Sequence, residues 1–132
     1  MDTIPAEAKL ISVRYGKTWY KSEIITHKDS GIEKLEDLRG KTFLFTNHES
    51  ASGYIIPSYI LKKEDIALKE TSFAGNHPMV SRLIYNKQYD AGATFYDDSI
   101  KGVIQDGRSL VIDELKDIKD MVKIIHVIKI EI

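Results

Sequence analysis

The sequence of 132 residues has no cysteine, only three prolines and one tryptophan, and no long hydrophobic run. The absence of cysteine excludes disulfide bonds and thiolate metal sites. No apolar stretch approaches the roughly 20 residues that a membrane-spanning helix needs, so we expect no membrane insertion. Residues 1–5 lack the basic and then apolar layout of a signal peptide, which leaves a cytoplasmic chain or a piece cut from a longer exported chain.

The sequence also lacks an excess of charge of either sign. Nineteen basic and twenty acidic side chains give a formal net charge of -1. Nucleic-acid-binding proteins usually carry a clustered basic excess, so we expect no nucleic-acid partner. With 42% apolar and 30% charged residues, the composition is that of one globular domain with a hydrophobic core.

Strand patterns alternate with helix patterns along the chain. We expect strands at residues 19–26, 42–46, 70–74, 91–96, 109–112 and 122–132, and helices at 33–39, 53–63, 76–87, 99–106 and 114–121. No repeat or internal linker interrupts them. The alternation predicts a three-layer α/β domain built on a mostly parallel sheet.

The stretch NHESASGYIIP, residues 47–57, follows a predicted buried strand and precedes a predicted helix. The first N–H groups of a helix have no internal partner, and the helix start carries a partial positive charge. Ser50 and Ser52 add hydroxyl donors, and Gly53 allows close backbone approach to a ligand. The pattern suits a tetrahedral oxyanion, but a simple serine cap of the helix explains it as well.

Two further polar segments follow strands 70–74 and 91–96. In open α/β sheets, ligands bind beyond the carboxyl ends of the strands, which places His77 and Asp97 at the same rim. His77, in the first turn of a helix, would be neutral and could donate one N–H to an anion; a solvent-exposed histidine is the alternative.

Asp97 and Tyr20 would serve other parts of a ligand. A carboxylate repels an oxyanion, so Asp97 suits the cationic end of a zwitterion such as an aminoalkyl phosphonate. Asp98 is expected to cap the helix 99–106. Tyr20 on the first strand could supply an aromatic wall, with Ser22 offering another hydroxyl, although Tyr20 is otherwise an ordinary strand aromatic.

The ordered segments YKS, ITHKDSGIEKLEDLRGKTFLFTNHESASGYIIP, FAGNH and YDAGATFYDD resemble the phosphate/phosphonate-binding proteins of ABC importers. Those proteins have the type 2 periplasmic-binding-protein fold, two α/β lobes that close over a ligand. The resemblance spans roughly residues 13–132.

The resemblance implies a non-catalytic oxyanion-binding site without cofactor or metal. The residues it points to are Ser50, Ala51, Ser52, Gly53, His77, Tyr20 and Asp97. Family members often have threonine where this chain has Ala51, which removes one hydroxyl and affects the preference among phosphonate, phosphate and phosphite.

The resemblance further implies that this chain is the second lobe alone. Residues 1–18 would cross from an absent first lobe, and residues 19–132 would form the lobe. The parent protein would be periplasmic, or extracellular and lipid-anchored, and would deliver its ligand to a permease. A native product near 15 kDa would refute the expectation of excision.

Three other functions compete with uptake. A sensor domain attached to a signalling protein would use the same fold. A serine hydrolase could use Ser50 or Ser52 with His77 and an aspartate, but the chain has no G-x-S-x-G motif. A metal site from His48, His77 and Asp97 lacks the ligand spacing of known sites.

Overall fold

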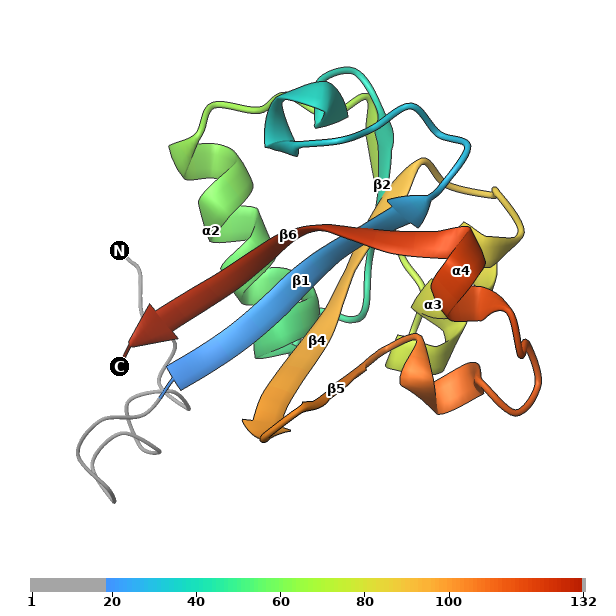
Figure 1. Cartoon of the computed structure of the whole chain (residues 1–132). Helices are drawn as coiled ribbons and strands as arrows, with labels where there is room; N and C mark the ends of the chain where they lie inside the picture. The colour runs from blue at the N-terminus through green and yellow to red at the C-terminus, as the bar shows by residue number, and fades with distance from the viewer. Residues whose placement is uncertain (1–18, 132) are drawn as a thin grey trace.

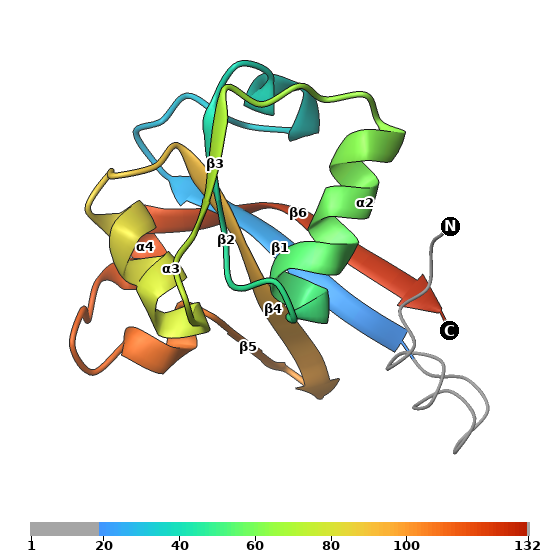
Figure 2. The same ribbon diagram turned by 180° about the vertical axis from the view of Figure 1, so that it is seen from behind.

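The computed structural model describes residues 19–131, and the expected crossing segment 1–18 lies outside them. Figures 1 and 2 show a twisted sheet with helices on both faces. The elements in chain order are β1 (Trp19–His27), the 3-10 helix η1 (Leu35–Leu38), β2 (Thr42–Phe45), the π-helix η2 (Ala51–Ile55), α2 (Ile56–Lys63), β3 (Glu70–Phe73), α3 (His77–Tyr85), β4 (Ala91–Ile100), β5 (Val103–Asp106), the 3-10 helix η3 (Ser109–Val111), α4 (Ile118–Met121) and β6 (Val122–Glu131).

The sheet is mixed, which corrects the expectation of a mostly parallel one. Its order is β3-β2-β4-β1-β6, with β5 paired to β4. β2 runs parallel to β3 and β4, whereas β1 runs antiparallel to β4 and β6. Strand and helix alternation alone does not fix strand direction, and β6 returns beside β1 with Trp19 opposite Glu131. The α/β class is as expected.

Two hydrophobic clusters on opposite faces of the sheet make the three layers. Successive strand residues alternate between them, because neighbouring side chains of a strand point to opposite faces. Ile24 and Phe43 belong to the cluster that α2 and η1 cover, while Ile25 and Leu44 belong to the one with α3 and α4. The core therefore fixes the register of the strands whose ends carry the polar segments.

Residues 99–106 are not the helix that their spacing predicted. β4 continues to Ile100, and β5 returns antiparallel with Ile100 opposite Val103. The two-residue turn uses Gly102 at φ +81°, a conformation that glycine adopts readily. The apolar residues are exposed by 59% at Ile100 and 43% at Val103, so their helical spacing does not reflect a buried helix face.

Asp98 consequently does not cap a helix. Its carboxylate pairs with Lys21 and, at 3.0 Å, with Lys129. Hydrogen bonds from these two ammonium groups lower the pKa of Asp98 to about 2.

Three further elements differ from their expected form. Residues 33–39 contain a single 3-10 turn, although Leu35 and Leu38 are buried as predicted. Residues 109–112 form a 3-10 turn in place of a strand. Only Ile118–Met121 of the expected 114–121 helix is helical.

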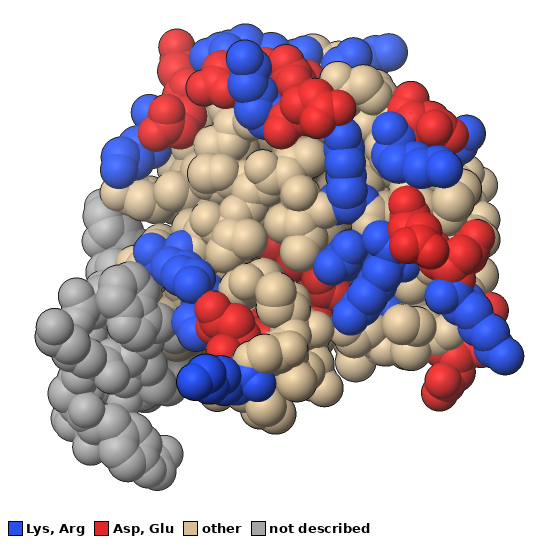
Figure 3. Space-filling view, in the orientation of Figure 1, with Lys and Arg blue, Asp and Glu red and all other residues tan. Residues whose placement is uncertain are grey.

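Surface charge is mixed, in line with the balanced composition. On the face shown in Figure 3, basic and acidic side chains are intermixed, and uncharged residues lie between them. Within residues 19–131, no helix has both the length and the apolar character needed to cross a membrane.

Candidate functional site

The loop after β2 leads directly into η2 and α2. The Ser50 hydroxyl oxygen accepts a hydrogen bond from the Gly53 N–H at 2.9 Å, so Ser50 is the N-cap of this helix. The Ser50 carbonyl accepts from the N–H groups of both Tyr54 and Ile55 at 3.0 Å, which widens the first turn into a π-helix. The cap interpretation of Ser50 is therefore correct, and the proton of its hydroxyl remains free to donate.

Gly53 allows the loop to pack against the end of β2. An added Cβ at this position would lie 2.1 Å from Thr46 Oγ1, far inside contact distance. The Thr46 N–H also donates to the Gly53 carbonyl at 2.9 Å. Close approach of two backbone segments thus explains this glycine within the protein itself.

Ser52 is held through its backbone. The Ser22 hydroxyl on β1 donates to the Ser52 carbonyl at 2.5 Å and lies 3.4 Å from the Thr94 carbonyl. Ser22 is fully buried, so this bond ties the loop to the centre of the sheet. The Ser52 side chain is half-buried, and within residues 19–131 its hydroxyl has no hydrogen-bond partner.

His77 is the first residue of α3, and Asn76 caps that helix by accepting from the Met79 N–H. The imidazole Nδ1 lies 2.7 Å from Thr94 Oγ1 and 3.4 Å from Thr46 Oγ1. The ring packs edge-on against Phe95 at 5.1 Å between ring centroids. Burial lowers the pKa of His77, so the ring is neutral at neutral pH.

The serine loop and the start of α3 meet at Thr46. This residue contacts Gly53 on one side and lies near His77 on the other. In Figure 1 both helices begin near the lower edge of the sheet, where β2 ends. We call Thr46, His77 and Thr94 the His77 cluster. The placement of the serine loop and His77 at one rim agrees with the sequence-based expectation.

Tyr20 and Asp97 lie outside this cluster. Tyr20 is partly buried and packs against the core cluster that also contacts Ala51. Asp97 Oδ1 accepts from the Ser99 N–H at 2.9 Å, and hydrogen bonding to Ser99 lowers the pKa of Asp97. The Asp97 carboxylate therefore stabilises the end of β4.

Thr46 and Thr94 are the residues that sequence reasoning missed. Both look like ordinary strand threonines, and both are buried, with exposed fractions of 1% and 0%. The only available signal was that Thr46 directly precedes the polar segment after β2, and Thr94, inside β4, offered none.

The arrangement does not support the competing sites. Among the described residues, neither serine hydroxyl is hydrogen bonded to His77, as a catalytic triad would need. The ring of His48 stacks on Phe73 at 3.9 Å. Within residues 19–131, no three or more His, Asp and Glu side chains form a group that could hold a metal ion.

A second polar cluster lies behind the rim, and we call Glu23, Asp106 and Arg108 the Glu23 cluster. The Asp106 carboxylate accepts from the Arg108 guanidinium at 2.7 and 2.9 Å, and Arg108 also donates to the Val122 carbonyl. Both Glu23 carboxyl oxygens are buried without a donor in the described part of the chain. Burial, followed by the charge of Asp106, raises the pKa of Glu23 to about 10, so Glu23 carries a proton.

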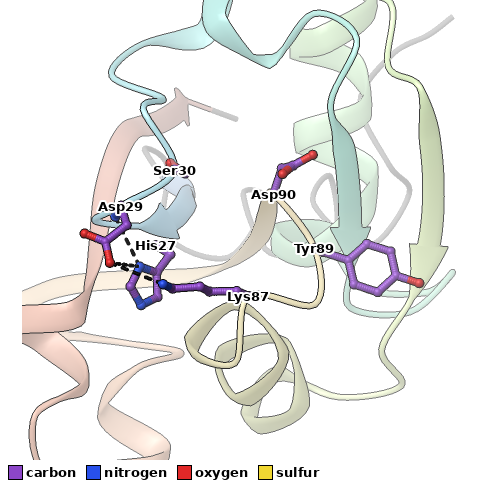
Figure 4. A pocket seen from close by; sticks show the side chains of 6 residues that line it. All are labelled: His27, Asp29, Ser30, Lys87, Tyr89 and Asp90. Atoms are coloured by element: carbon purple, nitrogen blue, oxygen red, sulfur yellow. Dashed lines mark hydrogen bonds and ion pairs between the residues drawn. The ribbon is translucent and has the colours of Figure 1, made fainter.

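A cavity of about 160 Å³ opens near the other end of β1. Its lining residues are His27, Asp29, Ser30, Lys87, Tyr89 and Asp90 (Figure 4). Asp29 pairs with Lys87 at 3.3 Å, and the Asp90 carboxylate accepts from the N–H and hydroxyl of Thr42. The Asp29, Lys87 and Asp90 side chains thus already have partners, so this cavity is a weaker candidate than the rim.

The chain is similar to several known proteins. It is 28% identical over 85 residues to a probable ABC transporter phosphite-binding protein, PhnD1, of Prochlorococcus marinus, covering 56% of this chain and 29% of that protein. The structure of PhnD1 from Prochlorococcus marinus in complex with methylphosphonate matches with a TM-score of 0.65 at 16% identity, over 97% of this chain and 59% of that one. XAC2383 from Xanthomonas citri, bound to chloride, matches with a TM-score of 0.65 at 20% identity, over 85% of this chain and 42% of that one.

These structural matches establish a type 2 periplasmic-binding-protein fold of the size of one lobe. The chain spans less than a third of the curated relative and roughly half of the matched structures. The family described as ABC transporter, phosphonate, periplasmic substrate-binding protein matches residues 3–128. The members of this family are substrate-binding proteins and not enzymes. The chain therefore belongs to the phosphonate family of periplasmic substrate-binding proteins of ABC transporters.

Proposed function

We propose that this chain binds a phosphate-like oxyanion, such as a phosphonate, phosphite or phosphate, at the rim formed by the serine loop and His77. It serves as the second lobe of a solute-binding protein that delivers its ligand to an ABC permease. The parent protein is periplasmic, or extracellular and lipid-anchored. The main observation in support is that Thr46 contacts both Gly53 and His77 at one edge of the sheet.

Unused donors at this rim support an anionic ligand. The hydroxyls of Ser50 and Ser52 have protons to donate, and the N–H groups of Ala51 and Ser52 are among the first of a helix and lack intrahelical partners. An oxyanion presents several acceptor oxygens and is favoured at a helix N-terminus. Ala51 offers only its backbone, which reduces the number of hydroxyl contacts.

Asp97 and Tyr20 would contact the substituent of the ligand. The Asp97 carboxylate would hold an amine if its bond to the Ser99 N–H opened. Tyr20 would contact the ligand from β1, the strand whose Ser22 anchors the loop. A ligand without an amine needs neither the charge of Asp97 nor its rearrangement.

The alternative is a ligand-sensing domain of a signalling receptor with the same fold. Ligand recognition would be identical, and the domains attached in the parent protein distinguish the two roles. The serine hydrolase alternative has no support, because the His77 ring bonds to threonine hydroxyls in place of a serine and an aspartate.

A calorimetric titration tests the proposal, with methylphosphonate, phosphite and phosphate as ligands and an uncharged sugar as the blank. Because one lobe supplies only part of a two-lobed site, we expect weak binding, of about millimolar affinity. Replacing Ser52 with alanine should weaken oxyanion binding by about 1–3 kcal/mol, the scale of a hydrogen bond to a charged group.

Ser58→Ala, at a half-buried serine of α2, is the matched control and should bind as the parent does. Equal affinities for the parent and Ser52→Ala would count against the assignment of the site. No heat from any oxyanion, with the chain folded and at millimolar concentration, would count against the function.

A further inference from the structure

We infer that Thr94 fixes the tautomer of His77, so that Nδ1 is an acceptor and the proton lies on Nε2. Thr94 is a positioning residue: it acts on the ligand only through the ring. The inference about the tautomer stands on the described contacts, and its consequence for binding rests on the proposed function.

Two buried threonine hydroxyls, those of Thr46 and Thr94, lie beside Nδ1 of His77. Thr46 Oγ1 donates to the Ala93 carbonyl at 3.1 Å, so its proton is already used. Thr94 Oγ1 has one hydrogen-bond partner within residues 19–131, which is Nδ1 of His77 at 2.7 Å. Thr94 is fully buried, so water does not reach its hydroxyl.

The two tautomers then differ in how many donors are satisfied. If Nδ1 carried the proton, it would donate to Thr94 Oγ1, and the Thr94 hydroxyl proton would have no acceptor in a dry interior. An unsatisfied buried donor is costly. If Nε2 carries the proton, the Thr94 hydroxyl donates to Nδ1, both buried hydroxyl protons have acceptors, and the Nε2 proton belongs to a ring that is only partly buried. The second arrangement is therefore the stable one.

The position of Thr94 is itself constrained from behind. An added Cβ at Gly107 would lie 2.3 Å from Thr94 Oγ1, so the backbone between Asp106 and Arg108 packs directly against this hydroxyl. Glu23 lies opposite Thr94 in the β1–β4 pairing. The buried Glu23 cluster thus supports the residue that orients the ring.

The tautomer decides whether Nε2 attracts or repels an oxyanion. In the inferred tautomer, this atom offers an N–H, which attracts an oxyanion. In the other tautomer, it offers a lone pair, which repels one. The partner of one imidazole nitrogen generally decides what the other nitrogen can do.

The test is a long-range 1H–15N correlation spectrum of the unliganded chain at neutral pH. The chain has four histidines, and His77→Gln assigns the signal of interest. We expect His77 to carry its proton on Nε2. His27 is an internal reference, because its Nδ1 accepts the Asp29 N–H at 3.1 Å and its proton should also lie on Nε2.

Thr94→Val removes the hydroxyl and keeps the shape. The nearest group to Nδ1 is then Thr46 Oγ1, which can only accept, so the His77 proton should move toward Nδ1. Thr94→Ser should retain the Nε2 proton. Thr26→Val, which removes an equally buried hydroxyl near the other end of β1, should leave the tautomer unchanged.

Binding of methylphosphonate gives a second readout. Thr94→Val should bind about tenfold more weakly and Thr94→Ser about as tightly as the parent, since only the first loses the donor at Nε2. A His77 proton on Nδ1 in the parent, or an unchanged tautomer in a folded Thr94→Val, would overturn the inference. If Thr94→Val does not fold, the spectra of the parent and Thr94→Ser decide it. A proton on Nε2 without methylphosphonate binding would sink the proposed function and leave the tautomer inference standing.

Discussion

The His77 cluster and the Glu23 cluster lie against the same strand, β4, yet one is open and the other closed. In the Glu23 cluster, the Arg108 guanidinium is taken up by Asp106 and the Val122 carbonyl, and no member is more than 8% exposed. In the His77 cluster, the Thr94 hydroxyl donates to Nδ1 and the Thr46 hydroxyl to the Ala93 carbonyl, so Nε2 has no hydrogen-bond partner within residues 19–131. The Glu23 cluster is therefore sealed from solvent, whereas the partly buried His77 ring leaves Nε2 available to a ligand.

The two clusters also differ in charge. The His77 cluster is built from neutral groups, because burial lowers the pKa of its histidine. The Glu23 cluster contains an ion pair and a protonated acid. We expect substitutions in the Glu23 cluster to change mainly the free energy of unfolding, and those at the rim to change mainly ligand binding.

The largest effect is expected from Arg108→Met. It leaves the Asp106 carboxylate buried without its partner, which typically lowers the free energy of unfolding by about 3–5 kcal/mol. Urea denaturation followed by circular dichroism measures the loss. Arg82→Met is the matched control, because Arg82 pairs with Glu114 at the surface and should matter much less. Equal losses in the two variants would mean that the cluster is not closed against water.

The second effect, smaller per pH unit than the loss from Arg108→Met, concerns Glu23 and pH. Its pKa is about 10 in the folded chain against an ordinary value of 4.5. Between these values the folded state holds the extra proton, so the free energy of unfolding falls as pH rises, by at most about 1.4 kcal/mol per pH unit. Glu23→Gln keeps a neutral side chain and should remove this decline.

Denaturation midpoints measured from pH 5 to pH 10 test the assignment. The parent and Glu23→Gln should differ least at the acid end and most at the alkaline end. Glu114→Gln is the control with the opposite sign, because hydrogen bonding to Arg82 lowers the pKa of Glu114 and its contribution is lost only in acid. A parent whose stability rises toward pH 10 would show that Glu23 is ionised.

A smaller effect is expected from Gly53→Ala at the open cluster. The new Cβ would meet Thr46 Oγ1, and overpacking of this kind costs about 1–3 kcal/mol. It should also weaken oxyanion binding, because the displaced Thr46 holds the serine loop beside His77. Gly102→Ala in the β4–β5 turn is the comparison: its Cβ meets no atom within 4 Å, but its φ of +81° strains an alanine, so it should cost stability without weakening binding. Unchanged binding by Gly53→Ala would separate the loop from the site.

The smallest effect is expected from Asp97→Asn. The carboxamide oxygen can still accept from the Ser99 N–H, so stability should change little. Affinity for 2-aminoethylphosphonate should fall, whereas affinity for phosphite should stay the same. Calorimetry with the two ligands decides it, and a uniform loss for both would mean that Asp97 is structural.

The sequence predicted the parts of the fold that depend on local pattern. Thr42–Phe45 is a buried strand, and Asn76 with Pro78 begins a helix as their residue types indicate. The prediction of a mostly parallel sheet was wrong. The direction of a strand depends on its partner, and β1 pairs with β6, about a hundred residues away in the sequence. The helix predicted around residues 100–104 was wrong. Its β-branched residues have helical spacing, but they flank a turn at Gly102 and form the two strands of a hairpin.

The sequence predicted where the candidate site lies, but not the contacts that hold its residues in place. Ser50, Ser52 and His77 were recognisable because each follows a strand. Thr46 and Thr94 were not, because their roles come from packing against Gly53 and His77, residues distant in sequence. The cap formed by Ser50 and the bond from Ser22 to the Ser52 carbonyl likewise depend on the folded loop.

The most direct test of the oxyanion site follows backbone amide signals while the parent chain is titrated with methylphosphonate. The largest shifts should occur in residues 51–54 and 76–79, at the starts of η2 and α3, and sodium chloride at equal ionic strength should not reproduce them. Shifts concentrated in residues 27–30 and 87–90, around the cavity near the other end of β1, or no shifts in either region, would contradict the assignment.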